Sequence, residues 1–340
     1  MNFTCSFSDS PAERFSKLIA FCFILLGSLF GNIFIIIIVY KNRDLRKTIN
    51  YFIVNMAVSD LLFTLIFPPV QITQLVTESL HLNVAGILGS IFCKSYIFTT
   101  LVSLFVSVQS LIWMAVDRFV AVVFPIKLGL ISSKIRTIAI VSTWIVAGAF
   151  FFPSLVYSGL SEYDNNTFCD SSVNKQSVFT NEEAFQGYYW LYVTICLLAP
   201  LFLITALHTA IVISLKRRSK DLVNSVQYEQ QPSVSRRRQA TKMVIVILVL
   251  FYICVIPNTL LRVVNHFRPF CAIQRSFTFI SDFMVSLSSV VNPIICLSFV
   301  ESYRRGLKNL VCCFYGIRDN KRTKRERITL KRIRNLPGEN

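Results

Sequence analysis

The residue in this sequence with the clearest chemical potential is an acidic side chain inside an apolar stretch. Asp60 lies in the middle of the run NMAVSDLL, residues 55–62. An ionised carboxylate in such surroundings needs a proton, a cation or several hydrogen-bond donors. Other apolar runs contain polar residues that can supply these partners: Asn32, Ser107, Ser288 and Asn292. The sequence predicts a sodium ion or a polar network at Asp60, and a purely structural hydrogen-bond cluster stays open as the alternative.

A second chemical pair is Asp117 and Arg118, which stand next to each other at the end of an apolar run. Adjacent opposite charges at a helix end can simply neutralise each other. The histidines offer less, because all three lie in separate segments without metal-ligand spacing: His81, His208 and His266. No nucleophile motif is present either, so the residues do not indicate an enzyme.

The elements that position these residues are long apolar helices. The chain has 340 residues, of which 54% are hydrophobic, and its mean hydropathy is +0.56. Runs of about 20 apolar residues span the hydrocarbon core of a bilayer. Seven such runs follow one another: 18–40, 51–76, 91–114, 135–156, 188–215, 243–261 and 277–300. The sequence therefore predicts an all-α membrane protein, a bundle of seven transmembrane helices.

Basic residues predict the orientation of the bundle. Lys and Arg cluster after the first, third and fifth runs, whereas residues 162–183, after the fourth run, contain five acidic residues and one basic residue. Because basic loops stay in the cytoplasm, we expect an extracellular N-terminus, a cytoplasmic C-terminus and a multi-pass location in the plasma membrane. The net charge of +17 then reflects segments that meet anionic lipids rather than nucleic acid. No cleavable signal peptide is evident, so the first helix is expected to serve as signal-anchor.

Six cysteines and two asparagines are candidates for covalent modification. Cys93 and Cys169 lie on the expected oxidising side and are predicted to form a disulfide, and Cys5 with Cys271 is a second candidate pair. Cys312 and Cys313 follow the last run on the cytoplasmic side, where acylation would attach the segment to the membrane, with two free thiols as the alternative. The glycosylation pattern occurs at two positions on the expected outer side, Asn2 and Asn165.

The order of motifs along these runs resembles the rhodopsin-like (class A) G protein-coupled receptor family, from the first helix to Cys313. The matching residues occur helix by helix: Gly31-Asn32, Asp60, Asp117-Arg118-Phe119, Trp144, Pro200, Pro257 and Asn292-Pro293. This resemblance implies a two-state bundle in which an outer ligand and an inner heterotrimeric G protein bias one equilibrium. Asp117 is expected to hold Arg118 at rest and to release it on activation. Pro257 and Pro293 interrupt helix hydrogen bonds where such motion can concentrate.

Three residues depart from the family pattern. Val255 stands where a tryptophan is usual, Cys296 replaces the tyrosine of the Asn-Pro-x-x-Tyr motif, and His208 replaces a fifth-helix tyrosine. Both tyrosines normally meet near the arginine through water. The resemblance therefore predicts coupling that is weaker, sensitive to pH through His208, or arranged through other residues. A seven-helix protein that binds a ligand without signalling is the corresponding alternative.

The ligand is expected in the outer half of the bundle, between helices. Thr100 stands where amine receptors carry an aspartate, and Ser286 stands where opsins carry the retinal lysine, which argues against both ligand classes. Further candidates near the cavity mouth are Gln71, Tyr192, Asn258, Arg262 and Asp282. The acidic outer loop favours a basic or amidated neuropeptide, and a lipid or other small molecule is the alternative. A transporter or channel is disfavoured because no inverted repeat is visible.

The same resemblance divides the chain into four parts. Residues 1–17 form the extracellular N-terminus, 18–300 the receptor domain, 301–315 a short amphipathic eighth helix along the membrane, and 316–340 a basic cytoplasmic tail. Tyr303, Leu307 and Leu310 mark the apolar face of the eighth helix. No cofactor is expected apart from a sodium ion as an allosteric ligand.

Overall fold

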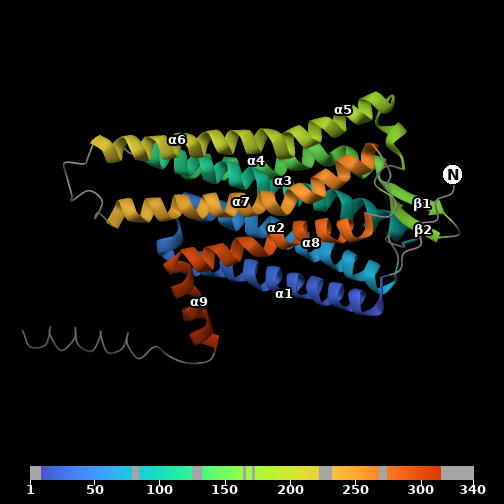
Figure 1. Ribbon diagram of the computed structural model, residues 1–340, viewed down its shortest axis with the longest axis horizontal. Helices are drawn as coiled ribbons and strands as arrows, with labels where there is room; N and C mark the ends of the chain where they lie inside the picture. Colours follow the sequence, from blue (N-terminus) through green and yellow to red (C-terminus); the bar gives the residue numbers. More distant parts are fainter. Residues whose placement is uncertain are drawn as a thin grey trace, which may run out of the picture.

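The structure is a bundle of long helices. The computed structural model of the chain describes residues 9–78, 84–124, 132–163, 166–170, 173–221, 232–267 and 274–314. Within these residues, 7 helical segments are long and apolar enough to cross a membrane, and they lie side by side (Figure 1). The predicted fold is confirmed, including a short helix after the last span.

The helices follow one another in the order that hydropathy predicts. They are α1 (Pro11–Lys41), α2 (Thr48–Val76), α3 (Gly86–Val123), α4 (Ser133–Tyr157), α5 (Glu182–Val193), α6 (Ala199–Asp221), α7 (Pro232–Phe267), α8 (Gln274–Phe299) and α9 (Glu301–Phe314). A π-helical turn, Thr194–Leu198, joins α5 to α6, so that Glu182–Ser214 forms one span. Between α4 and α5, β1 (Gly159–Tyr163) pairs antiparallel with β2 (Asn166–Asp170). Short 3₁₀ turns occur at Arg43–Leu45 and Lys175–Ser177.

The first helix begins earlier than its apolar run. Ser10 caps it, because the Ser10 hydroxyl accepts from the Glu13 backbone N–H and the Glu13 carboxylate accepts from the Ser10 backbone N–H. Pro11 occupies the first turn, where its missing N–H costs nothing. Residues 11–17, which the sequence assigned to the extracellular N-terminus, are therefore helical, because charged residues ended the apolar run but did not end the helix.

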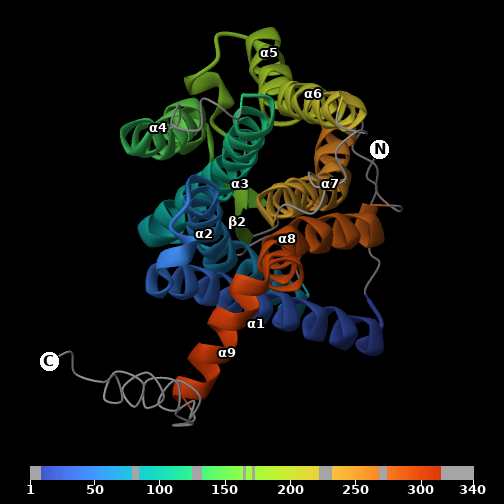
Figure 2. The same cartoon turned by 90° about the vertical axis from the view of Figure 1, so that its left-hand side faces the viewer.

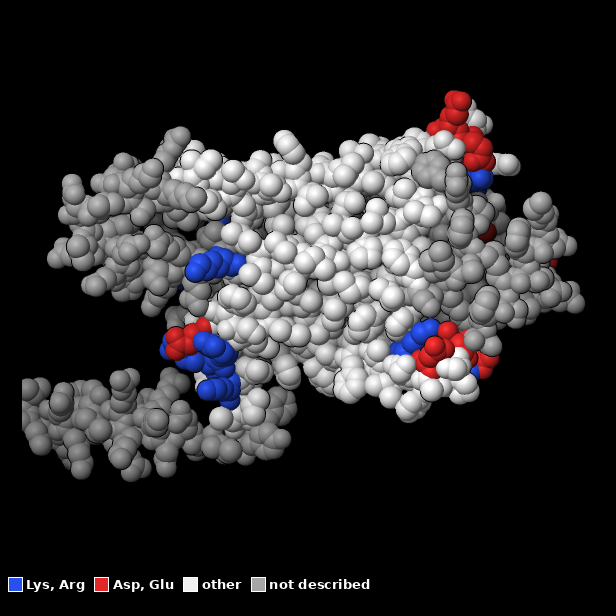
Figure 3. Space-filling view, viewed as in Figure 1, with Lys and Arg blue, Asp and Glu red and all other residues white. Residues whose placement is uncertain are grey.

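The two ends of the bundle differ in structure and charge. One end, here called the disulfide end, carries β1 and β2 and the predicted bond between Cys93 and Cys169, whose Cα atoms are 5.4 Å apart. The opposite end, the Arg118 end, carries Arg118 and α9. Charged side chains on the face shown in Figure 3 lie near these ends, with an uncharged band between them. Four modification candidates lie outside the described residues: Asn2, Cys5, Asn165 and Cys271.

Close packing at Gly31 and hydrogen bonds from Asn55 hold helices together. A Cβ atom on Gly31 of α1 would lie 2.8 Å from Cγ of Pro293 in α8, so the absence of a side chain permits this close approach. Asn55 of α2 connects three helices at once. Its Nδ2 donates to Ser110 Oγ of α3 (2.9 Å) and Thr143 Oγ1 of α4 (3.2 Å), and its Oδ1 accepts from Trp144 Nε1 of α4 (2.9 Å).

The short helix α9 turns away from the bundle axis and crosses the end of α1 (Figure 2). Tyr303 and Leu310 are buried and Leu307 is half-buried, as expected for the apolar face. The opposite face exposes three basic residues, Arg304, Arg305 and Lys308. Cys312 has a free, half-buried thiol, and the side chain of Cys313 lies outside the described part of the chain.

Candidate functional site

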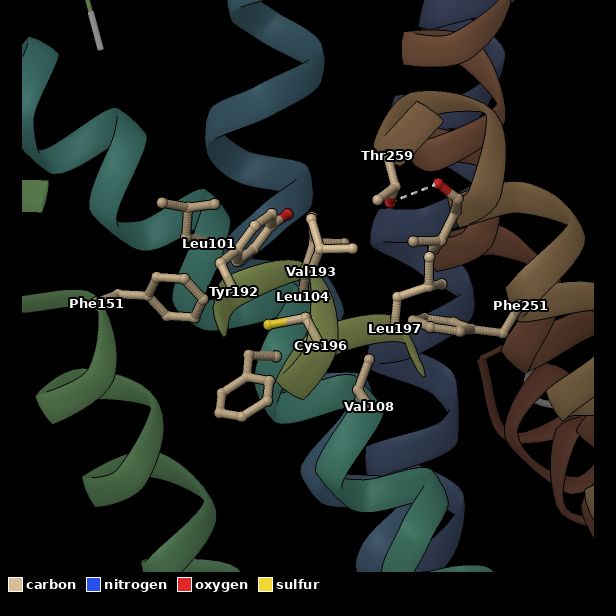
Figure 4. A pocket seen from close by; sticks show the side chains of 12 residues that line it. Leu101, Leu104, Val108, Phe151, Tyr192, Val193, Cys196, Leu197, Phe251 and Thr259 are labelled. Atoms are coloured by element: carbon tan, nitrogen blue, oxygen red, sulfur yellow. Dashed lines mark hydrogen bonds between the residues drawn. The ribbon is translucent and has the colours of Figure 1, made fainter. Parts of the chain in front are cut away.

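A small apolar cavity lies between α3, α4, α7 and the span formed by α5 and α6 (Figure 4). It measures about 30 Å³, which is room for one or two water molecules. Leu101, Phe151 and Tyr192 form part of its wall, and Val255 lies beside them. Val255 is the residue that replaces the usual tryptophan. A tryptophan here would project its indole into the space that the cavity occupies.

The π-helical turn shapes one wall of this cavity. Pro200 lacks an N–H group, and the turn immediately before it widens the helix so that the Ala199 N–H reaches the Thr194 carbonyl. Cys196 and Leu197 lie in the turn and line the cavity. Hydropathy predicted one uninterrupted helix over 188–215 and missed this turn. Pro200 was the only signal for it in the sequence.

A polar cluster joins α7 to α8 towards the disulfide end, and it consists of Asn258, Arg262 and Asp282. Asn258 Nδ2 donates to Asp282 Oδ1 (2.8 Å), and Arg262 Nε donates to Asn258 Oδ1 (2.8 Å). Asn258 is buried, Asp282 is half-buried and Arg262 is exposed. The structure therefore brings three of the six ligand-binding candidates into one hydrogen-bonded group, which we call the Asn258 cluster.

Aromatic residues surround the Asn258 cluster. Tyr192 interacts electrostatically with Arg262 and also lines the apolar cavity, so the cluster and the cavity are neighbours. Tyr96 lies near Arg262 and Asp282, and its hydroxyl also lies near the Gln71 side chain. Gln71 thus adjoins the Asn258 cluster through Tyr96. A tyrosine at position 96 was not among the sequence candidates, because nothing in its apolar run distinguishes it.

Thr100, the remaining ligand candidate, is deeply buried. Its side chain is 5% exposed, and its Oγ1 has no hydrogen-bond partner within the described ranges. A buried hydroxyl without a partner is costly and is available to a polar group that enters the bundle. The structure places no hydrogen bond between Thr100 and the Asn258 cluster.

Asp60 is held by two of its four predicted partners. Ser107 Oγ donates to Asp60 Oδ1 (3.1 Å), and Asn292 Nδ2 donates to Asp60 Oδ2 (2.8 Å). Ser59, which was not predicted, adds a hydroxyl 2.7 Å from Ser107 Oγ. These bonds connect α2, α3 and α8 in the middle of the bundle.

The other two predicted partners bind elsewhere. Asn32 Nδ2 donates to the carbonyls of Ser28 (2.9 Å) and Ser289 (3.0 Å), so it joins α1 to α8. Through the hydroxyls of Ser28 and Thr64 it is also connected to the Asp60 backbone carbonyl. Ser288 Oγ donates to the Val285 carbonyl of its own helix at 2.6 Å. A serine in a helix readily satisfies its hydroxyl in this way. Asn32 and Ser288 therefore do not contact the Asp60 carboxylate, and Asn32 joins the network only through the Asp60 backbone carbonyl.

The residues around Asp60 offer oxygen donors to a cation. The donor set consists of oxygen atoms, which hard cations prefer: the Asp60 carboxylate, Ser107 Oγ and Asn292 Oδ1. Asn292 Oδ1 is buried and has no hydrogen-bond partner within the part of the chain that the structure describes. A sodium ion bound here would supply a positive charge opposite the carboxylate.

At the other end of the bundle, Asp117 holds Arg118. Both Nε (3.0 Å) and Nη2 of Arg118 donate to Asp117 Oδ2. Phe119 packs edge-on against Phe124, with ring centroids 5.9 Å apart. This pairing is the arrangement that the family resemblance implies for the resting state.

Of the two residues that replace tyrosines, His208 is half-buried and Cys296 is fully buried. His208 Nδ1 lies 2.9 Å from the Ile204 carbonyl, and its Nε2 is buried with no hydrogen-bond partner among the described residues. Cys296 is 0% exposed. Pro257 and Pro293 lie inside α7 and α8 as predicted. The sequence reasoning missed one contact near Cys296, a hydrogen bond between Tyr303 and Asn50.

Comparisons with known proteins agree with this geometry. The family described as "7 transmembrane receptor (rhodopsin family)" matches residues 31–295. The QRFP-like peptide receptor of Branchiostoma floridae is 25% identical over 308 residues, covering 89% of this chain and 79% of its own. The allatostatin-A receptor of Bombyx mori is 26% identical, with coverage of 92% and 85%, and the substance-P receptor of Mus musculus is 26% identical, with coverage of 86% and 70%. The chain thus belongs to the rhodopsin family of seven-transmembrane receptors and is a receptor rather than an enzyme.

Proposed function

We propose that this receptor binds an extracellular peptide at the disulfide end and activates a heterotrimeric G protein at the Arg118 end. The observation that carries the peptide proposal is the Asn258 cluster, which lies beside an apolar cavity. One of the named relatives is described as a peptide receptor, beside the allatostatin-A receptor and the substance-P receptor.

The charges of the cluster favour a particular kind of ligand group. Arg262 uses Nε for Asn258, and Asp282 uses Oδ1, which leaves guanidinium N–H groups and a carboxylate oxygen for a ligand. The two formal charges cancel, so a lone anion or a lone cation would meet a like charge nearby. A peptide group that both accepts and donates hydrogen bonds satisfies both residues at once. A lipid tail would use only the apolar cavity and leave the cluster without a partner.

The distribution of charge supports an extracellular disulfide end. Exposed acidic residues at this end include Glu162, Glu182 and Glu183. Exposed basic residues at the Arg118 end include Lys41, Arg43, Arg46, Lys47, Lys134, Arg304, Arg305 and Lys308. Basic residues that flank membrane spans are kept in the cytoplasm. The acidic end would also attract a basic peptide from solution.

Sodium is a proposed allosteric ligand at Asp60, on the basis of the oxygen donors of Ser107 and Asn292. Bound sodium would stabilise the state in which these three residues converge, and an agonist that favours the other state would bind more weakly. The measurement is agonist affinity in sodium chloride and in an equal concentration of choline chloride. Asp60→Asn should abolish the difference between the two salts, and a difference that survives the substitution would rule out this site.

The test of the peptide proposal is a synthetic peptide library applied to cells that express the receptor, with G protein activation as the readout. An active peptide should lose about tenfold or more in potency with Arg262→Gln, because a hydrogen bond to a charged group contributes about 1.5–3 kcal/mol. Arg14→Gln is the matched control, since Arg14 pairs with Glu78 away from the cavity. Arg118→Ala, at equal surface expression, should abolish the response while binding persists.

Other outcomes separate the alternatives. Activation by lipid fractions with none by peptides would replace the peptide proposal with the small-molecule alternative. Peptide binding without G protein activation in the unmodified receptor would favour a non-signalling binding protein. Equal potency of the Arg262→Gln and Arg14→Gln variants would remove the Asn258 cluster from the site.

A further inference from the structure

A stack of three aromatic rings lies between α2 and α3. The ring centroids of Phe63 and Phe67 are 5.0 Å apart, and Phe67 stacks on Tyr96 at 6.2 Å. We call these three rings the Tyr96 stack. Both phenylalanines are 2% exposed, and Val255 of α7 packs against the cluster that they form with Val285 of α8. The stack thus lies beside the position where a tryptophan is usual in the family.

The outer end of the Tyr96 stack adjoins the Asn258 cluster. Tyr96 lies near both charged members of that cluster, Arg262 and Asp282. Val285, which packs against the two phenylalanines, follows Asp282 by three residues and so lies on the same side of α8. A peptide that binds Arg262 and Asp282 therefore displaces groups that adjoin the stack.

The inner end of the stack lies one turn from Asp60. Phe63 follows Asp60 by three residues on α2, so the two side chains project from the same side of the helix. The next residue, Thr64, donates from Oγ1 to the Asp60 carbonyl at 2.6 Å. A rotation of this turn that follows Phe63 therefore also moves the Asp60 carboxylate relative to Ser107 and Asn292.

Two prolines make α2 deformable where the stack crosses it. Pro68 and Pro69 lie inside the helix directly after Phe67. Neither has an N–H group, so the helix lacks two successive backbone hydrogen bonds and can bend there. Tyr96 adjoins both sides of this break, because its hydroxyl lies near Gln71 and its ring stacks on Phe67. A shift of Tyr96 can therefore move the two halves of α2 relative to each other.

We propose that Tyr96 is a positioning residue that transmits the state of the Asn258 cluster through Phe67 and Phe63 to Asp60. This proposal rests on the proposed function, because it links the peptide site to the sodium site. The route crosses the proline break in α2. In this receptor it takes the place of a tryptophan at position 255.

The first test is a double-mutant cycle on the melting temperature of the purified receptor, which requires neither a peptide nor a G protein. Asn258→Ala dismantles the cluster without changing the charge, and Asp60→Asn removes the buried carboxylate. Substitutions at separate sites have additive effects unless something couples them. With the stack intact, the double variant should depart from additivity by about 1–3 °C, which is the usual size of such couplings divided by the unfolding entropy of 340 residues. Phe67→Leu should restore additivity.

Three further variants separate the stack from general packing. Phe52→Leu is the matched control, because Phe52 is a fully buried residue of the same helix that stacks on Trp113 of α3 at 5.9 Å. The departure from additivity should persist in this background. Tyr96→Leu breaks the stack from α3 and should restore additivity, whereas Tyr96→Phe keeps the ring and should not. Additivity in the unmodified background, or a coupling that survives Phe67→Leu and Tyr96→Leu and so runs along α8 instead, would overturn the proposal.

Sodium binding supplies a second readout, which a purely structural role of Phe67 would not alter. The melting temperature is titrated with sodium chloride while choline chloride keeps the ionic strength constant. Asn258→Ala should change the half-saturating sodium concentration about threefold or more in the unmodified and Phe52→Leu backgrounds, and should leave it unchanged in Phe67→Leu. If sodium has no effect on melting, the proposed sodium site fails and the double-mutant cycle still decides the role of the stack. If the cycle is additive throughout, the stack fails and the proposed binding sites are unaffected.

Discussion

Asn55→Ala tests whether one side chain joins three helices of the bundle. The amide makes three hydrogen bonds, to Ser110, Thr143 and Trp144, on two neighbouring helices. At about 0.6 kcal/mol for each interhelical bond, their loss costs about 2 kcal/mol. Because the unfolding entropy is about 2.1 cal/mol/K per residue, a change of this size lowers the melting temperature of a 340-residue chain by roughly 3 °C.

The assay is thermal unfolding of the purified receptor in detergent, with Ser110→Ala as the comparison. That variant removes one of the three bonds, so its destabilisation should be about a third of that of Asn55→Ala. Trp144→Phe likewise removes a single bond and keeps most of the ring. If Asn55→Ala and Ser110→Ala melt at the same temperature, the three bonds do not contribute separately and the reasoning is refuted.

Two further substitutions test packing. Val255→Trp should weaken peptide binding by tenfold or more at normal surface expression, because the indole would occupy the cavity of about 30 Å³. Unchanged affinity in a competition assay would mean that the ligand does not enter this cavity. Gly31→Ala should destabilise the receptor by about 1–3 kcal/mol, because the new Cβ would lie 2.8 Å from the rigid ring of Pro293. Gly148→Ala is the control, since nothing lies within 4 Å of a Cβ atom at that position. Equal melting temperatures of the two variants would contradict the prediction.

Hydropathy and motif order predicted most of the fold. Seven apolar runs gave seven spans, because the bilayer imposes one length on every segment that crosses it. The Cys93–Cys169 bond followed from both cysteines lying on one side of the membrane. The beginning of α1 could not be read from hydropathy, because a capping box sets it and charged residues are compatible with a helix outside the apolar layer.

The candidate site was only partly predictable. Arg262, Asn258 and Asp282 were named from their spacing to the two prolines, and the structure joins them. The partners of Asp60 were harder to predict, because a serine or an asparagine in a helix can bind its own backbone or another helix. Ser288 does the first, and Asn32 does both. Such choices depend on the rotation of each helix about its axis, which the sequence of one span does not specify.

The two main departures from the family pattern differ in their structural consequences. Near Cys296, Tyr303 supplies a buried hydroxyl from the next helix, so an aromatic anchor is still present at the Arg118 end. At Val255, the described residues leave a cavity, although Phe251 and Tyr252 pack edge-on close by with centroids 6.0 Å apart. A small apolar group of the ligand can therefore fill part of the volume that a tryptophan fills elsewhere in the family. It follows that a peptide which lacks such a group should still bind the Asn258 cluster but should activate the receptor poorly, because it would leave the cavity between α3 and α7 unfilled.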